Sequence, residues 1–497
     1  MKLEIENRTK YLNDYYFQTM CLLYFPGEKF KAGFESENYA YFFLEETGYR
    51  QLNARVVLGV GDKRAEGVFC GGYEPTIPMG DDFYAMNAIG KAFLRAGKAL
   101  FGFELPWGYI TGLRPVKRAK YYLDLGYSAE QVIDLFNRDY EVSMEKSTLS
   151  VETALIQQKM LEDLKPNDCG LYVSIPFCPT RCDYCSFVSY SNAKLFALIP
   201  EYLEKLMQDI RKTGEMIKAL GLNLKAIYIG GGTPSILDPM QINRLLSCIN
   251  ESVDIQNGVE YTFEAGRPDT ITSEKLKAVR SNGVGRISIN PQSTSDFVLE
   301  QIGRKHSAAR FFEAAEQAFS VGFDTINADL IAGLPGDTKA SFEKSLEDVI
   351  TLGFHNITVH TLSIKNAANL RFAGDGYYDP RGVFARDCVD YARTRLKGAG
   401  YAPYYLYRQK NTVGNAENTG YSLPGRENIY NIIMMEENST VFACGAGSIT
   451  KLVSPNRDEI LRHAFPKYPF EYLSDNKDLG FEEAKAFFDQ FKKGDLQ

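Results

Sequence analysis

Three cysteines within eight residues are the strongest chemical signal in this sequence. Cys178, Cys182 and Cys185 have the spacing C-x3-C-x2-C and follow a short apolar run at Leu171–Phe177. Thiolates are soft ligands that favour zinc or iron–sulfur clusters. Structural zinc usually has four protein ligands, and Cys169 lies at the far end of an expected strand, roughly 20 Å away. Three thiolates on a four-iron cubane would instead leave one iron open to a small molecule.

Six short apolar or β-branched runs, separated by helix-period segments, predict the scaffold that positions these cysteines. The expected strands are Leu171–Phe177, Lys225–Ile229, Glu260–Glu264, Arg286–Ile289, Thr325–Ile331 and Ile357–Leu362. Six βα units in succession indicate a parallel sheet with right-handed crossovers. Nearly every expected strand ends in polar or glycine residues. A barrel brings the ends of many strands together around one site, whereas a doubly wound sheet places its binding site at a single switch point in the strand order. We therefore predict an α/β fold with a partial (β/α)6 barrel.

The length of 497 residues suggests about three domains. Residues 1–165 mix strand-like and helical segments, so we expect a separate N-terminal α+β domain there. Residues 166–399 would form the barrel. Residues 400–497 are polar and loop-rich before Val441–Ile449, and we expect them to form a C-terminal α+β extension that covers the substrate.

Composition excludes several classes of protein. With 44% hydrophobic and 24% charged residues the chain is not disordered as a whole. The net charge of −7 argues against non-specific binding to nucleic acid or to an anionic membrane. Nine cysteines are too sparse for a disulfide scaffold. Glu4 and Glu6 stand where a signal peptide would be basic, and no apolar run approaches the ~18 residues of a membrane span. We expect a soluble, cytoplasmic protein.

The cysteine loop, with Tyr184 before its last cysteine, resembles that of radical S-adenosylmethionine (SAM) enzymes. The resemblance narrows to the oxygen-independent coproporphyrinogen III oxidase family because of the run Tyr172-Val-Ser-Ile-Pro-Phe-Cys178. Within that family the sequence most resembles the HemZ-type coproporphyrinogen dehydrogenases. Upstream, Leu105–Pro115 matches only that subgroup. Across about residues 166–450 the matching motifs are Gly230-Gly-Gly-Thr-Pro234, Phe263-Glu264, Arg286-Ile-Ser-Ile-Asn-Pro-Gln292, Gly303-Arg-Lys-His306, Asp329-Leu-Ile-Ala-Gly-Leu-Pro335, Gly425-Arg-Glu-Asn428 and Gly445-Ala-Gly-Ser448.

The resemblance implies a [4Fe–4S] cluster on Cys178, Cys182 and Cys185, with SAM on the fourth iron. One electron, from reduced flavodoxin or ferredoxin, would cleave SAM to methionine and a 5′-deoxyadenosyl radical. The implied reaction converts two propionates of coproporphyrinogen III to vinyls, giving protoporphyrinogen IX in anaerobic haem and porphyrin biosynthesis. By matching position, the residues that would contact SAM are Tyr172, Tyr184, Gly231, Gly232, Thr233 and Glu264, with Gln292, Arg304 and Asp329 at a second SAM molecule.

Each contact residue also has an ordinary structural explanation. The glycines could form a tight strand-to-helix turn, Glu264 could be a solvated strand-end carboxylate, and Tyr172 could be a half-buried strand aromatic. His360, in the sixth expected strand, fits a core histidine better than a ligand. The joint spacing of the motifs favours the functional interpretation.

Substrate propionates would need fixed cations, for which arginine is suited. One candidate is the aromatic–basic stretch from Trp107 to Arg114, with the helix expected from Pro115. A hydrated surface helix explains that stretch equally well. Arg408, Lys410 and Arg426 form a second candidate set.

Two positions depart from the family pattern. Ser186-Phe187 follows the last cysteine, whereas the decarboxylating oxidases have a further cysteine there, and this ending resembles that of the related haem chaperones. Late in the sixth expected strand, the family oxidase has a small residue that contacts the second SAM molecule. Here the sequence reads His360-Thr-Leu362-Ser. Three hypotheses follow: a coproporphyrinogen-decarboxylating enzyme, a haem-binding or haem-delivery protein on the same scaffold, and a zinc protein of the same shape.

Overall fold

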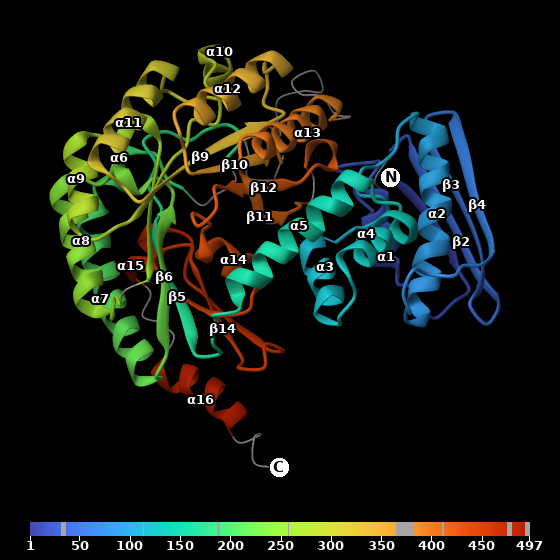
Figure 1. The fold of residues 1–497 in the computed structure, drawn as a ribbon, viewed down its shortest axis with the longest axis horizontal. Coiled ribbons are helices and arrows are strands. Elements are labelled where there is room, and N and C mark those ends of the chain that lie inside the picture. The colour runs from blue at the N-terminus through green and yellow to red at the C-terminus, as the bar shows by residue number, and fades with distance from the viewer. Residues whose placement is uncertain are drawn as a thin grey trace. The chain divides into compact units, whose positions relative to one another are not determined.

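The computed structural model divides the chain into two compact units, and each is described by itself. Unit 1 contains Met1–Ile156 and Leu406–Glu417, and unit 2 contains Gln157–Tyr405 and Asn418–Gln497 (Figure 1). The described residues are 1–30, 36–112, 114–185, 189–256, 258–363, 382–409, 412–474 and 480–492. The predicted domain bounds at 165 and 399 stay predictions, while contacts group residues 406–417 with unit 1 and residues 418–497 with unit 2. The predicted role of residues 400–497 as a substrate cover stays a prediction.

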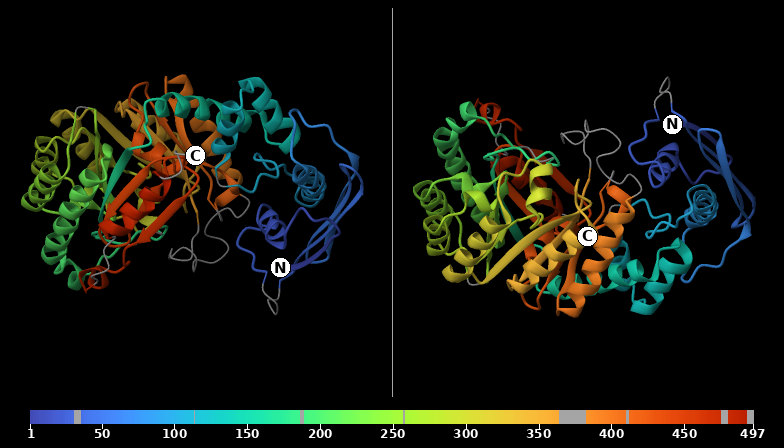
Figure 2. Two further views of the ribbon diagram at one scale, coloured as in Figure 1. Left: turned by 90° about the horizontal axis from the view of Figure 1, so that it is seen from below. Right: turned by 90° about the horizontal axis from the view of Figure 1, so that it is seen from above.

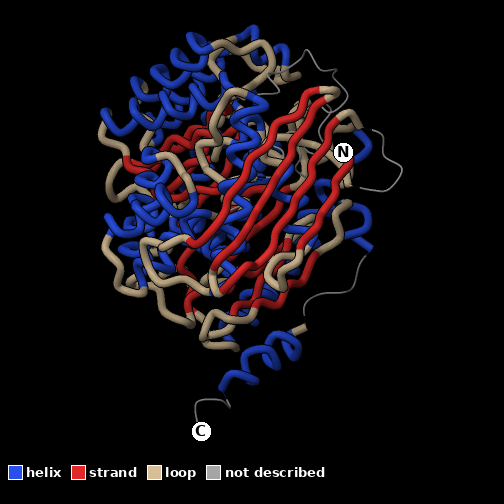
Figure 3. The backbone as a smooth tube through the Cα atoms, turned by 90° about the vertical axis from the view of Figure 1, so that its right-hand side faces the viewer, coloured by secondary structure: helices blue, strands red, loops and turns tan. Residues whose placement is uncertain are grey.

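Unit 1 is built on a four-stranded sheet in the order β1-β2-β3-β4, whose strands lie side by side in Figure 3. Strand β1 is parallel to β2, and the other pairs are antiparallel. The strands are β1 (Lys2–Asn7), β2 (Asn38–Gly48), β3 (Gln51–Val60) and β4 (Lys63–Gly72). Alternate residues of β2 are buried, as in Ala40, Phe42 and Leu44, because successive side chains of a strand point to opposite faces.

Helices cover one side of this sheet and complete unit 1. The longest, α2 (Asp81–Phe101), packs on β3 and β4. The others are α1 (Asp14–Cys21), α3 (Pro115–Asp124), α4 (Ala129–Asp134), a π-helical turn at Leu135–Asp139, and the part of α5 (Met144–Leu161) up to Ile156. Pro115 begins α3, where its missing N–H carries no penalty, and Ser128 with Gln131 forms a capping box at α4.

Unit 2 contains an eleven-stranded sheet in the order β11-β12-β10-β9-β8-β7-β6-β5-β13-β14-β15. Its centre is six parallel strands in chain order: β5 (Asp168–Ile175), β6 (Asn223–Gly231), β7 (Glu260–Gly266), β8 (Arg286–Ile289), β9 (Thr325–Ala332) and β10 (Asn356–Thr361). The predicted α/β fold with six βα units is confirmed. Strand β13 pairs with β5 and strand β12 pairs with β10, so the outer strands of the six bind further strands rather than each other.

The helices between these strands lie along the outer side of the sheet (Figures 1 and 2). They are α6 (Ala193–Phe196), α7 (Ile199–Ala219), α8 (Pro239–Ser252), α9 (Ser273–Ser281), α10 (Asp296–Gln301), α11 (Ala308–Val321), α12 (Lys339–Thr351) and α13 (Val383–Gly398). Helix α7 buries Leu203, Leu206 and Ile210 on one face, as its sequence period predicts. Side-chain caps at Asp238 and Ser307 begin α8 and α11.

The chain after residue 400 is more regular than its loop-rich sequence suggests. It forms β11 (Ala402–Tyr407), β12 (Asn418–Ser422), α14 (Ile429–Glu436), β13 (Thr440–Cys444), β14 (Ile449–Val453), β15 (Ile460–Ala464), α15 (Pro469–Ser474) and α16 (Phe481–Lys492). Strand β12, with the sequence NTGYS, is buried at every residue and pairs antiparallel with β10. Polar residues form this strand because their neighbours in the sheet satisfy its backbone groups.

Candidate functional site

The cysteine loop follows the carboxyl end of β5 and is held by backbone hydrogen bonds. The Cys178 N–H donates to Tyr190 O (3.0 Å), the Cys185 N–H to Cys182 O (3.1 Å), and the Asp183 N–H to Ile302 O (3.1 Å). Cys178 and Cys182 are buried, and Cys185 is partly exposed. The three thiols thus lie on one ordered loop at the strand end where a barrel has its mouth.

The donor set fits an iron–sulfur cubane. One loop carries three thiols that form no disulfide, and the third, on Cys185, is partly exposed. Within the described ranges, no three or more His, Cys, Asp or Glu side chains are grouped to hold a single metal ion. That finding does not bear on a cubane, whose thiolates bind different iron atoms.

The glycine turn after β6 packs directly against this loop. The Thr233 hydroxyl donates to Cys178 Sγ (3.2 Å), and the Thr233 N–H donates to Phe177 O (2.8 Å). A Cβ atom on Gly232 would lie 2.6 Å from Phe177 O and 3.0 Å from Cys178 Sγ. Gly231 has φ +112°, a conformation that favours glycine. The glycines are therefore needed for the close approach of turn and loop, and the contact of Gly231, Gly232 and Thr233 with SAM stays a prediction.

Burial raises the pKa of the Cys178 thiol to about 11, although hydrogen bonds from Thr233 and Ser189 oppose the shift. A thiol must lose its proton to bind iron. Metal binding at Cys178 therefore releases a proton near neutral pH, and a higher pH favours it.

Tyr184 and Arg304 meet beside the second cysteine. Arg304 is buried, and its Nη1 donates to the Tyr184 hydroxyl (2.9 Å) and lies 3.9 Å from Cys182 Sγ. Its Nη2 donates to Asn290 O. The structure thus brings together two predicted cofactor contacts that are 120 residues apart in sequence.

Glu264 is a partly buried carboxyl group near the carboxyl end of β7. The Tyr228 hydroxyl donates to Glu264 Oε2 (3.3 Å). Burial, with a further contribution from Asp329, raises the pKa of Glu264 to about 8, although the Tyr228 hydrogen bond opposes this. A cation beside Glu264 would hold it ionised. The site therefore suits an ammonium group, as the predicted contact with the amine of SAM requires.

Tyr172 lies in a stack of three tyrosines. Its ring centroid is 6.2 Å from that of Tyr228 and 6.1 Å from that of Tyr430, and Tyr228 and Tyr430 are 4.6 Å apart. Register pairing places Tyr172 on β5 opposite Tyr228 on β6. This stack forms an aromatic wall one strand from Glu264.

Asp329 is part of a polar network across three strands. Asn327 Nδ2 donates to Asp329 Oδ1 (2.9 Å) and to Ser288 Oγ (2.8 Å), and His360 Nε2 lies 3.7 Å from Asp329 Oδ2. Burial opposes ionisation of Asp329, but His360 and Asn327 hold its pKa below the usual range. The His360 side chain is 26% exposed, so it is not a core histidine as the sequence suggested. Glu264, Ser288 and Asn327 are register neighbours and share one face of the sheet.

Gln292 has an unusual backbone for its residue type. Its φ is +67°, and backbone hydrogen bonds to Asp329 (2.9 Å) and from Ile331 (3.0 Å) hold it beside β9. Its side chain is buried, and among the described residues Oε1 has no hydrogen-bond partner. An unpaired buried amide oxygen can accept from a bound ligand, which fits the predicted cofactor contact.

Comparison with known proteins decides the family. Residues 172–349 match the model of the radical SAM superfamily. The oxygen-independent coproporphyrinogen-III oxidase-like protein HemZ of Bacillus subtilis is 37% identical over 400 residues, 79% of this chain and 80% of that protein. The chain belongs to the HemZ family of radical SAM proteins.

Two further comparisons place this HemZ-family chain. The haem chaperone HemW of Bacillus subtilis is 31% identical over 285 residues, 56% of this chain and 69% of that protein. The solved structure of the coproporphyrinogen III oxidase HemN of Escherichia coli, a radical SAM enzyme, aligns with this structure at a TM-score of 0.51. The alignment covers 65% of this chain and 71% of that chain, with 22% sequence identity. The fold predicted from sequence is thus that of a solved radical SAM enzyme.

The cofactors of the HemZ-family chain are a [4Fe–4S] cluster and SAM. The predicted assignments of the cluster to Cys178, Cys182 and Cys185, and of the SAM contacts to individual residues, stay predictions that the geometry above fits. In the described part of the chain, no helix is long and apolar enough to cross a membrane.

Sequence reasoning missed several residues of this site. Tyr228 lies two residues before Gly230, and Asn327 lies two residues before Asp329. Because every second side chain of a strand points to the same face, both could have been predicted from those positions. Tyr430 lies on α14, in a region whose sequence predicts loops. Arg267, which follows β7 and contacts Cys182, carries no local sequence signal.

The Trp107 motif belongs to the core of unit 1. Trp107 is buried, and its Nε1 donates to Glu417 Oε2 (2.9 Å). Arg408 is buried 5.4 Å from the Trp107 ring and donates from Nη1 to Ile110 O (2.6 Å). The use of Arg408 for propionates stays a prediction, and in this structure the guanidinium is buried beside Trp107. Lys410 lies outside the described residues.

Arg426 is at the opposite end of the strands from the cysteine loop. Its Nη1 donates to Asp324 O (2.6 Å), and Asp324 directly precedes β9. Cys178, by contrast, follows the carboxyl end of β5. Arg426 is therefore a poor candidate for holding a propionate beside the cluster, and Arg114, which precedes α3 in unit 1, keeps its role only as a prediction.

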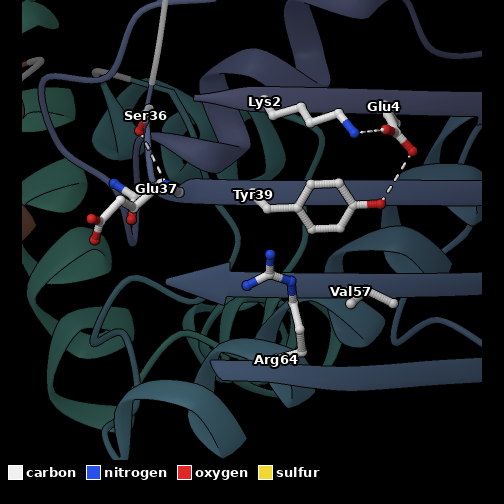
Figure 4. A pocket seen from close by; sticks show the side chains of 8 residues that line it. Lys2, Glu4, Ser36, Glu37, Tyr39, Val57 and Arg64 are labelled. Carbon is white, nitrogen blue, oxygen red and sulfur yellow. Dashed lines mark hydrogen bonds and ion pairs between the residues drawn. The ribbon is translucent and has the colours of Figure 1, made fainter. Parts of the chain in front are cut away.

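A pocket of about 570 Å³ lies on the open face of the sheet in unit 1 (Figure 4). Lys2 and the Tyr39 hydroxyl both point to Glu4, at 2.7 and 3.2 Å, and the Arg64 guanidinium lies 5.1 Å from the Tyr39 ring. Lys2 and Glu4 form an exposed ion pair, and Arg64 Nη1 donates to the backbone oxygens of Gly61 and Lys63 (2.5 and 2.9 Å).

Proposed function

We propose that this chain is an oxygen-independent coproporphyrinogen III oxidase that converts two propionates of coproporphyrinogen III to vinyls, giving protoporphyrinogen IX. The observation that carries the proposal is the convergence of the cysteine loop, Glu264 and Asp329 at the carboxyl ends of the parallel strands. The similarity to HemZ over 79% of the chain supports it.

The chain's own residues would divide the work of holding the cofactors. Cys178, Cys182 and Cys185 would bind the cluster, and Glu264 would pair with the amine of SAM, since a carboxylate accepts hydrogen bonds from an ammonium. The Tyr172 ring and the Tyr184 hydroxyl would line the same cofactor. When bound, the cluster and SAM supply a one-electron cleavage that yields a radical able to take a hydrogen atom.

The Asp329 network would act on a second ligand. Gln292, Arg304 and Asp329 would contact a second SAM molecule, with His360 fixing the Asp329 carboxylate at 3.7 Å. Rigid positioning of the ligands would raise the rate, because the reaction needs a propionate C–H bond held beside the radical source.

Each propionate loses a hydrogen atom, CO2 and one electron when it becomes a vinyl group. One hydrogen atom leaves the β-carbon, the carboxylate leaves as CO2, and one electron passes to an acceptor as the vinyl group forms. Each turnover also needs one electron for SAM cleavage, for which reduced flavodoxin or ferredoxin is the proposed donor. The protein would act in the cytoplasm, where such donors are available.

The second candidate is haem binding or haem delivery on the same scaffold. Two observations favour it: the 31% identity with the haem chaperone HemW, and Ser186-Phe187 after the last cysteine, a pair outside the described residues. Both functions require the same cluster, so they differ in the tetrapyrrole that the chain accepts.

Product analysis separates the two candidates. Anaerobic incubation of the reconstituted chain with coproporphyrinogen III, SAM, reductant and an electron acceptor should give protoporphyrinogen IX, methionine, 5′-deoxyadenosine and CO2. A Cys182→Ala control should give none of these. SAM cleavage without CO2, together with tight binding in a haem titration, would reject the oxidase and support haem delivery.

A further inference from the structure

Arg267 is a buried guanidinium aimed at one cysteine of the cluster loop. It follows β7 and is 3% exposed. Its Nη1 lies 3.8 Å from Cys182 Sγ and donates to Thr180 Oγ1 (2.6 Å) and to Thr180 O (3.3 Å). The rest of the fork binds Asp269, with Nε to Oδ1 at 2.9 Å and Nη2 to Oδ2 at 2.8 Å. The side chain is therefore fixed on both sides.

A second guanidinium reaches the same sulfur. Arg304 Nη1 lies 3.9 Å from Cys182 Sγ, and Arg304 is also buried. Cys178, by contrast, accepts from the neutral Thr233 hydroxyl. The charges of Arg267, Arg304 and Asp269 sum to one net positive charge beside Cys182.

His306 does not alter this sum. It is buried, and burial together with Arg304 and Arg267 lowers its pKa to about 3. The imidazole is therefore neutral at ordinary pH.

We propose that Arg267 is a positioning residue that raises the reduction potential of the cluster bound at Cys182, with Asp269 moderating its charge. Reduction adds a negative charge to the cluster, part of which resides on its sulfurs. Net charge and hydrogen bonds to those sulfurs set the potential of iron–sulfur clusters, and such outer contacts tune metal sites generally. A buried cation acts strongly because the interior screens it less than water does.

This inference holds for either tetrapyrrole function, because it concerns the cluster and not the substrate. The alternative is a purely structural role for Arg267. Arg267 holds Thr180, which lies between Cys178 and Cys182, so its only role could be to shape the loop. The two roles predict different responses to conservative substitution.

The test is a redox titration of the full-length chain, reconstituted anaerobically and without SAM. The electron paramagnetic resonance signal of the reduced cluster gives its midpoint potential. Arg267→Met should lower the reduction equilibrium constant about tenfold or more, about 59 mV for one electron. Arg267→Lys keeps the charge and should restore most of the loss. Asp269→Asn removes the opposing carboxylate and should raise the potential.

A matched control is Arg395→Gln, which breaks a two-point pair with Glu347 (2.6 and 2.8 Å) away from the cysteine loop and should leave the potential unchanged. Iron and sulfide content are measured for every variant. If Arg267→Met does not retain its iron, Asp269→Asn decides the matter: a potential above those of the wild type and Arg267→Lys supports the proposal, and a potential equal to or below them overturns it. Equal potentials in all iron-loaded variants, or shifts of the same sign in Arg267→Met and Asp269→Asn, would overturn the proposal.

Discussion

The hydroxyl of Thr233 lies 3.2 Å from the sulfur of Cys178, so the glycine turn after β6 and the cysteine loop after β5 are built against each other. Gly232 occupies the tightest point of this contact, where a Cβ atom would lie 2.6 Å from a backbone oxygen. The loop therefore depends on its neighbouring strand for its shape, and not only on its own sequence.

Gly232→Ala should displace the loop and reduce bound iron. We expect a loss of about 1–3 kcal/mol in the free energy of unfolding, because an added methyl group overpacks a close contact. Thermal unfolding and iron content measure the two effects. Gly398→Ala is the control, since a Cβ atom there meets nothing within 4 Å. Equal stability and equal iron content in the two variants would contradict this prediction.

Cys182→Ala should abolish the visible absorbance of the cluster and SAM cleavage by the reduced protein. Cys248→Ser and Cys388→Ser should keep the full iron content, because both thiols are buried on helices away from the loop. Iron and sulfide analysis after reconstitution measures this. A Cys182→Ala variant with four irons and full activity would refute the cluster assignment.

Glu264 should make the cluster-free protein less stable as the pH rises. Its pKa is about 8 in the folded state and lower when unfolded, so the folded state holds a proton that the unfolded state loses. Stability is greatest below the unfolded pKa and falls as the pH rises toward 8. Partial exposure limits the effect to on the order of 2 kcal/mol. Thermal unfolding of wild type and Glu264→Gln between pH 5 and 8 should show this fall in the wild type alone.

Glu264→Gln should also weaken SAM binding by about 1.5–3 kcal/mol, the loss of a hydrogen bond between charged groups. Calorimetric titration of the cluster-loaded protein measures the affinity. In the wild type the affinity should rise with pH up to about 8, since only the ionised carboxyl pairs with an ammonium. An equal affinity and pH profile in the variant would remove Glu264 from the SAM site.

Glu417→Gln should destabilise unit 1 by about 3–5 kcal/mol, because it takes the buried carboxylate from Lys146, which pairs with it at 2.5 Å. Glu104→Gln, which breaks an exposed pair with Lys98, should change stability by less than about 1 kcal/mol. Chemical denaturation measures both. Iron content should not change in either variant, and its loss in Glu417→Gln alone would place Glu417 in the cofactor site.

Local sequence determined the features whose physical cause is local. The three cysteines fall in one loop, so their spacing favoured an iron–sulfur site over a zinc site, and a short apolar run placed β8 at Arg286–Ile289. The resemblance of ordered motifs indicated the radical SAM family, which the comparison with HemZ confirmed.

Only the tertiary structure decided which distant groups meet. Arg267 and Arg304 converge on Cys182 from 85 and 122 residues away, and the polar strand β12 is buried because β10 pairs with it. Arg408 and Trp107, 301 residues apart in sequence, pack together, which neither local sequence indicates. Burial and long-range pairing depend on how the whole chain folds back on itself, and a local pattern of residue types does not contain that information.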